Sequence, residues 1–186
     1  MLNEALLFLL DVVLQSFAAI LLLRFHLQWL RAPLRNPVGE FVMVFTDFIV
    51  LRARRYIPSA WGYDSATLVL ALLIELLYLT GVLWIQGYPG SLWPGLFVLS
   101  AVKLIKISLY LLMGAVFAQA ILSWVNPHTP ISSVLAVITE RFLQPLRRIV
   151  PMLGSIDLSS MILLIICQLI VIVPVGMLER LAFSLF

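Results

Sequence analysis

The chain has 186 residues, of which 63% are hydrophobic and 11% charged, and its formal net charge is +3. Soluble domains contain roughly 25% charged and 45–50% apolar residues, so a chain of this composition has too little polar surface to coat a water-soluble globule. The composition indicates a membrane protein, and the length suffices for four spans of ~20 residues with their connections.

Four apolar stretches are long enough to cross a bilayer, at about residues 3–29, 65–85, 98–125 and 158–178. Each is bounded by a loop that contains Pro or Gly, or by a charge cluster. The first stretch begins with the acidic Glu4 and Asp11, whereas a cleaved signal peptide begins with a basic region. We therefore expect four retained transmembrane helices in an all-α membrane protein.

Two shorter runs lie between the spans, within residues 37–58 and 130–151. Each would form a helix of about 22 Å at ~1.5 Å per residue, too short to cross a hydrocarbon core of ~30 Å. The second run alternates polar and apolar side chains at three- and four-residue steps, which is typical of an amphipathic helix. We expect both to be helices that lie in the membrane interface or re-enter the membrane.

The chain contains an internal repeat at an offset of 93 residues. Polar and proline residues coincide under this shift, which shared hydrophobicity alone does not produce. The matches are Pro37 with Pro130, Thr46 with Thr139, Arg54-Arg55 with Arg147-Arg148, Pro58 with Pro151 and Asp64 with Asp157, while Asp47 meets Glu140 and, with a two-residue gap, Trp29 meets Trp124.

The repeat divides one membrane domain, residues 1–186, into units of about 1–93 and 94–186. Each unit holds two spans, an even number, so both units enter the membrane in the same direction. The sequence therefore predicts parallel tandem repeats related by an axis along the membrane normal, unlike the inverted repeats of many transporters.

The distribution of basic residues predicts the orientation. Eight of the twelve lie in the two connections within the units: Arg31, Arg35, Arg52, Arg54, Arg55, Arg141, Arg147 and Arg148. By the positive-inside rule these connections face the cytoplasm and both chain termini lie on the outer side, the periplasm in a bacterial inner membrane.

The motifs RAPLRNPVGEF, RRYIP and PLRRIVP, the paired TD and TE dipeptides, and Asp64 with Asp157 resemble the YggT/YlmG family over nearly the whole chain. The resemblance implies a bacterial inner-membrane protein with relatives in chloroplasts. Relatives are linked to cell division and nucleoid placement, maturation of a membrane cytochrome, and osmotic or potassium stress. The first unit departs from the pattern at residues 51–53, where the second has Gln144-Pro145-Leu146.

The paired charges of the connections have two interpretations each. Arg54, Arg55, Arg147 and Arg148 fit contacts with a helix C-terminus and lipid phosphates, or a docking patch for an acidic partner. Asp64 and Asp157 precede the second span of each unit, where Asp is a favoured N-cap. An Arg–Asp pair across the connection is the alternative, and both roles can hold together.

Polar residues within the spans recur at equivalent positions of the two units. Glu75 falls on Gln168, and with the gapped offset Asp11 falls on Lys106 and Arg24 on Gln119. Such residues at membrane depth mark interhelical hydrogen bonds, an ion or proton path, or a site for a partner's helix. We expect the pairs Asp11–Lys106 and Arg24–Glu75, with Gln119–Gln168 as the uncharged copy of the second.

No catalytic or metal-binding motif is present in the sequence. His26 and His128 are isolated from other metal ligands, so a structural role is favoured over a haem link. The arginine clusters lack the interleaved aromatic residues typical of nucleic-acid binding. We therefore expect no catalytic residues, no metal, no cofactor and no nucleic-acid partner.

These observations favour a non-enzymatic scaffold or assembly factor of the inner membrane, serving the cell envelope, division or the biogenesis of a membrane complex. It would contact the lipid bilayer and other membrane or membrane-associated proteins. A homo-oligomer is also compatible with the sequence. The alternative is a small transporter or channel subunit in ion or osmotic homeostasis. An enzyme or cofactor-insertion factor is a third, weaker hypothesis.

The topology is directly testable. Alkaline phosphatase fused after Phe186 should be active, because the arginine distribution places that end outside the cytoplasm. Phosphatase activity and the fluorescence of a cytoplasm-only green fluorescent protein at the same junction are the two measurements. Fluorescence at that junction would contradict the predicted orientation and place the C-terminus in the cytoplasm.

Overall fold

The computed structural model describes residues 1–58, 64–87, 93–126, 129–149 and 157–185, which form helices and no strand. Four of these helices are long and apolar enough to cross a membrane: Leu2–Trp29, Ser65–Ile85, Pro94–Ser123 and Leu158–Phe183. The four predicted spans are therefore confirmed as helices. The fourth continues five residues beyond its predicted end at 178, and this extension places a charge discussed below.

The first span is a continuous helix with a π-helical turn inside it. It consists of α1 (Leu2–Leu10), η1 (Asp11–Gln15) and α2 (Ser16–Trp29). Its end is a Schellman motif, in which Arg31 adopts a φ of 55° and the Ala32 amide donates to the Leu27 carbonyl at 2.8 Å. This turn reverses the chain sharply.

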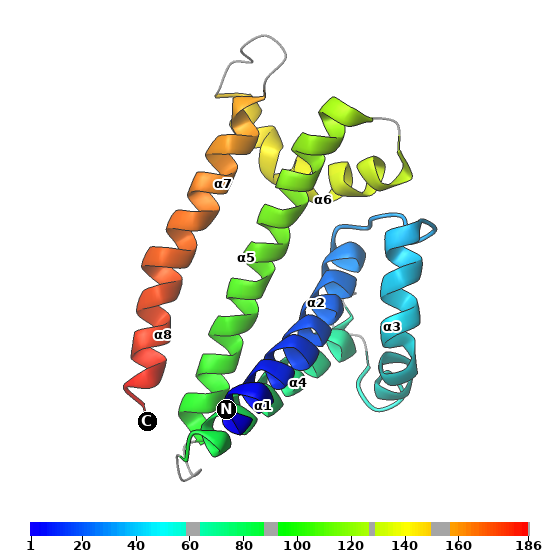
Figure 1. Ribbon diagram of the computed structural model, residues 1–186. Coiled ribbons are helices and arrows are strands. Elements are labelled where there is room, and N and C mark those ends of the chain that lie inside the picture. The colour runs from blue at the N-terminus through cyan, green and yellow to red at the C-terminus, as the bar shows by residue number, and fades with distance from the viewer. Residues whose placement is uncertain (59–63, 88–92, 127–128, 150–156, 186) are drawn as a thin grey trace.

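The turn leads directly into α3 (Pro37–Ala53), which runs back beside α2 (Figure 1). Asn36 caps α3 by accepting a hydrogen bond from the Gly39 amide at 2.9 Å, and Pro37 occupies the first helical position. A Cβ at residue 39 would overlap the Leu34 carbonyl, so only glycine allows this close approach of the backbone.

The second half of the chain has the same order of helices, a span, a short helix and a second span. α4 (Ser65–Ile85) completes the first half, and α5 (Trp93–Val125) opens the second. α6 (Pro130–Arg147) follows, capped by Thr129 and again with proline at its first position. The last span combines α7 (Leu158–Ile170), η2 (Val171–Val175) and α8 (Gly176–Phe183).

Both chain ends lie at one end of the bundle, and the N-terminal ends of α3 and α6 lie at the other (Figure 1). α6 crosses α5 near the C-terminal end of α5, whereas α3 runs alongside α2. With 17 and 18 residues, α3 and α6 are about 25–27 Å long at ~1.5 Å per residue, shorter than a hydrocarbon core of ~30 Å. Their placement in the membrane interface stays a prediction.

Buried apolar side chains join the two halves. One cluster contains Leu21, Leu22, Val50, Leu70, Ala71 and Leu104, from α2, α3, α4 and α5. A second contains Leu27, Ala32, Val42, Ala115, Val134 and Ile138, so that it links α2 and α3 to α5 and α6. Buried side chains of α2, α5 and α6 therefore hold the two halves together.

Candidate functional site

Arg24 is a charged residue inside the first span, and its side chain is only 4% exposed. Its Nη1 donates to the Thr46 hydroxyl at 2.6 Å and to Asp47 Oδ1 at 2.7 Å, both on α3. Thr46 in turn donates to the Val42 carbonyl at 2.6 Å. The Arg24 Nε is buried without a partner. A buried guanidinium needs this acceptor set, so it fixes α3 against α2.

The second half contains the matching contact without the charge. The Thr139 hydroxyl of α6 forms hydrogen bonds with the Gln119 side chain of α5 and with the Leu135 carbonyl, the latter at 2.9 Å. Thr139 lies 93 residues after Thr46, and Leu135 lies 93 after Val42. Residues that coincide under the sequence offset therefore make equivalent contacts.

An Arg–Asp ion pair joins the C-terminal end of each short helix to the start of the next span. Arg54 Nη2 lies 2.7 Å from Asp64 Oδ2, and Arg147 Nη2 lies 2.8 Å from Asp157 Oδ2. The Gln28 amide, in the orientation that satisfies both of its ends, donates to Asp64 at 3.0 Å and accepts from Arg54 at 3.1 Å. The alternative to capping, an arginine–aspartate pair across the connection, is present in both halves.

These ion pairs stabilise the ionised carboxylates. Burial alone would raise the pKa of Asp64, but hydrogen bonds from Arg54 and Thr67 outweigh it and the pKa is lowered. Burial likewise opposes the net lowering of the pKa of Asp157, which results from hydrogen bonds with Ser159 and Arg147. Both aspartates are therefore charged near neutral pH.

The capping role differs between the two aspartates. Asp157 accepts a hydrogen bond from the Ser159 amide at 3.0 Å, so it caps α7 as predicted. Asp64 stands at the N-cap position of α4 but makes no side-chain hydrogen bond to the amides of the first turn. Its carboxylate is occupied by the side chains of Arg54 and Thr67.

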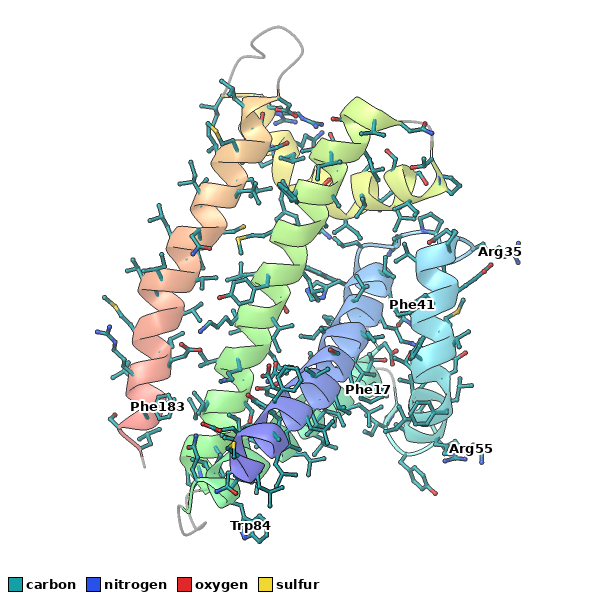
Figure 2. The ribbon with its side chains drawn as sticks, in the orientation of Figure 1. Phe17, Arg35, Phe41, Arg55, Trp84 and Phe183 are labelled. Carbon is teal, nitrogen blue, oxygen red and sulfur yellow. The ribbon has the colours of Figure 1, made fainter. Side chains whose placement is uncertain are left out.

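The second arginine of each pair has a different environment. Arg55 and Arg148 are exposed and form no ion pair with a described carboxylate. Figure 2 shows Arg35 and Arg55 at the outer edge of the molecule, at the two ends of α3. Glu140 joins Arg147 at 2.7 Å instead of contacting the span as its counterpart Asp47 does.

A separate group of polar residues lies nearer the chain termini. Glu75 is fully buried on α4, and the Gln15 amide donates to both of its carboxylate oxygens at 3.1 Å. Tyr78 donates to Asp11 at 3.0 Å, and the Lys103 ammonium lies 5.5 Å from the centre of the Tyr78 ring. Asp11 and Gln15 bound the π-helical turn of the first span.

The predicted pair Arg24–Glu75 is wrong, because α3 folds back along α2 and supplies Thr46 and Asp47 at the position of Arg24. Glu75 lies closer to the chain termini and meets Gln15. The uncharged copy Gln119–Gln168 is also wrong: Gln119 contacts Thr139, and Gln168 is exposed on α7.

The predicted pair Asp11–Lys106 is wrong for a related reason. Lys106 Nζ lies 2.8 Å from Glu179 Oε1, because the fourth helix continues beyond its predicted end and places Glu179 beside α5. Asp11 instead faces Tyr78 of α4. The sequence signals that could have identified partners were the repeated Thr46 and Thr139. No pattern pointed to Gln15, Tyr78 or Glu179.

The described part of the chain contains no group of three or more His, Cys, Asp or Glu side chains that could hold a metal ion. His26 forms a hydrogen bond through Nδ1 with the Leu22 carbonyl at 2.6 Å, within its own helix. His128 lies outside the described residues. The site is thus a set of ion pairs and hydrogen bonds between helices.

Four candidate spans joined by these contacts define a multi-pass membrane protein. The model of the CCB3/YggT family matches residues 3–85 and 98–178, and the chain belongs to this family. It is 32% identical over 165 residues to "Uncharacterized protein YggT" of Escherichia coli (strain K12), covering 88% of this chain and 85% of the relative.

Two further relatives show similar agreement. "Uncharacterized protein PA0392" of Pseudomonas aeruginosa is 33% identical over 172 residues, covering 91% of this chain and 87% of the relative. "Uncharacterized protein in proC 3'region" of Vibrio alginolyticus is 33% identical over 160 residues, 85% of this chain and 86% of the relative. No solved structure matches the chain.

Separating Arg24 from Asp47 should destabilise the protein. In detergent, Asp47→Asn should lower the free energy of unfolding by about 1–3 kcal/mol, less than the ~3–5 kcal/mol of a fully buried pair because Asp47 is 41% exposed. The double variant Arg24→Gln with Asp47→Asn should lose less free energy of unfolding than the sum of the losses in the two single variants. The combination Arg24→Gln with Glu75→Gln is the control and should be additive. If the losses in free energy of unfolding at Arg24 and Asp47 were additive, the two side chains would not form a coupled pair.

Proposed function

We propose that this protein is a non-enzymatic scaffold or assembly factor of the bacterial inner membrane, and that α3 docks an apolar helix of another membrane protein. The observation that supports this role is a continuous row of exposed apolar side chains along α3. The row consists of Phe41, Val44, Phe45, Phe48 and Leu51, which are 48–76% exposed.

The row is suited to packing against a helix. The Phe41 and Phe45 rings lie 4.6 Å apart, and Phe48 lies 6.0 Å from Phe17 of the first span, so part of the surface is already ordered. In lipid, helices associate by close van der Waals packing because lipid tails are as apolar as leucine. A rigid aromatic surface gains such contacts without a large loss of side-chain freedom.

The opposite face of α3 fixes this surface in place. Gly39, Val42, Thr46 and Val50 are buried, and Arg24 anchors Thr46 and Asp47. Two of the corresponding positions of α6 are polar, since Phe48 is matched by Arg141 and Leu51 by Gln144. Of the two short helices, α3 is therefore the one with the more apolar outer face. Arginines 52 and 55 at its end complement acidic residues at the end of a partner's helix.

We further propose that the two halves are parallel repeats whose short helices lie on the cytoplasmic side, with both termini in the periplasm. The equivalent contacts of Thr46 and Thr139, and of the two Arg–Asp pairs, support a common ancestral unit. The two stretches matched by the family model are nearly equal in length, which agrees with this division. Both chain ends lie at one end of the bundle, as two parallel units require (Figure 1).

Docking on α3 can be tested by photo-crosslinking in cells. Benzoylphenylalanine at Phe45 should give a discrete adduct that maps to a membrane-spanning segment of one partner protein, because the ring lies on the exposed row. The same probe at Leu73 of α4, 52% exposed, is the matched control and should give no such adduct. An adduct with a second copy of this chain would show that the row mediates self-association and would contradict docking of another protein. Lipid adducts alone at Phe45 would contradict a protein-binding surface.

A second function, a proton or ion path, is favoured by Glu75. This carboxylate is fully buried within a span, and the Gln15 amide is the partner that the structure shows. Ionisable residues at membrane depth are costly and commonly serve transport. If the path exists, liposomes containing the protein should dissipate an imposed pH gradient, and Glu75→Gln should abolish the flux. A scaffold should give no flux above that of empty liposomes.

A further inference from the structure

The seam between the two halves contains an apolar cavity of about 260 Å³. Its lining comes from α2, α5 and α6 and includes Leu23, His26, Trp29, Ser108, Ile138 and Phe142. A cavity of about 300 Å³ shares His26 and Ser108 with it, and another of about 370 Å³ shares Leu23 and Ile138. The 260 and 300 Å³ spaces both border Ile105 and Ser108 and follow the seam between α2 and α5, whereas the 370 Å³ space borders Tyr110 and Gly114 on another face of α5.

The interior of this seam suits a hydrocarbon chain. Two of its polar side chains form hydrogen bonds within their own helices, since His26 Nδ1 bonds to the Leu22 carbonyl and Ser108 donates to the Leu104 carbonyl at 2.8 Å. The remaining lining is almost wholly aliphatic or aromatic. An α-helix, at about 10–12 Å in diameter, is too wide for spaces of this size, whereas a flexible acyl chain can enter them.

One end of the seam carries a positive charge. The Arg141 guanidinium of α6 lies 5.4 Å from the centre of the Trp29 ring, and Trp29 lines the cavity beside His26. Stacking on an aromatic face leaves the N–H edge of a guanidinium open to oxygen acceptors. Arg141 is exposed and forms no ion pair with a described carboxylate, because the neighbouring Glu140 pairs with Arg147.

We propose that the seam binds one anionic membrane phospholipid, with an acyl chain between α2 and α5 and the phosphate held by Arg141 above Trp29. The cavity and the charge are adjacent, and together they match the two parts of such a molecule. The first half has no equivalent, since the counterpart of Arg141 is Phe48. This site is separate from the exposed row of α3 and does not depend on partner docking there.

Native mass spectrometry of the full chain tests this site. The probes are dioleoyl phosphatidylglycerol and dioleoyl phosphatidylethanolamine, added in equal amounts to the detergent-solubilised protein. Retained phosphatidylglycerol should exceed retained phosphatidylethanolamine. Arg141→Gln should lower that retention about tenfold, which corresponds to one charge-assisted contact.

Two further variants separate the headgroup from the chain. Arg35→Gln, before α3 at the outer edge of the molecule, removes the same charge away from the seam and should leave retention unchanged. Ser108→Leu fills the lining and should lower the retention of both lipids, with an unchanged melting temperature as the check on folding. Equal retention of the two lipids by the unmodified protein, or an equal loss with Arg35→Gln and Arg141→Gln, would overturn the proposal. Since Arg141 is exposed, its variant remains decisive even where Ser108→Leu fails to fold.

Discussion

The arrangement of the first half depends on the burial of one guanidinium. Arg24 lies inside a membrane span with 4% of its side chain exposed, and a charge in that position is costly unless polar groups surround it. The span itself offers no such groups, since its own backbone is already hydrogen-bonded. α3 supplies them from Thr46 and Asp47. Its return along α2 is therefore a requirement of the charge as well as of apolar packing.

The second half shows what changes when that charge is absent. Gln119 contacts Thr139 as Arg24 contacts Thr46, while Glu140 pairs with Arg147 and not with the span. α6 lies across α5 and presents Arg141 and Gln144 where α3 presents Phe48 and Leu51. The two short helices thus differ in their outer faces, which are apolar on α3 and polar on α6.

The sequence predicted the features that depend on local pattern. Span positions follow from hydropathy and the starts of the two short helices from Pro37 and Pro130, while the Arg–Asp pairs were one of two interpretations of residues repeated at a fixed offset. The partners of Arg24, Glu75 and Lys106 were wrong because they depend on how helices rotate and slide against one another. Equal depth in a repeat does not make two residues neighbours. A helix end misjudged by five residues was enough to hide Glu179.

The two halves also complement each other at the seam. Trp29 ends the first span, and the guanidinium above its ring comes from α6 of the second half. The cavity below the ring is likewise lined by α2 on one side and by α5 and α6 on the other. A single unit could form neither the cavity wall nor the charged end. Because the counterpart of Arg141 is Phe48, two identical units would lose the charge at this place. The difference between Phe48 of α3 and Arg141 of α6 therefore gives the one helix its aromatic surface and the other the cationic end of the seam.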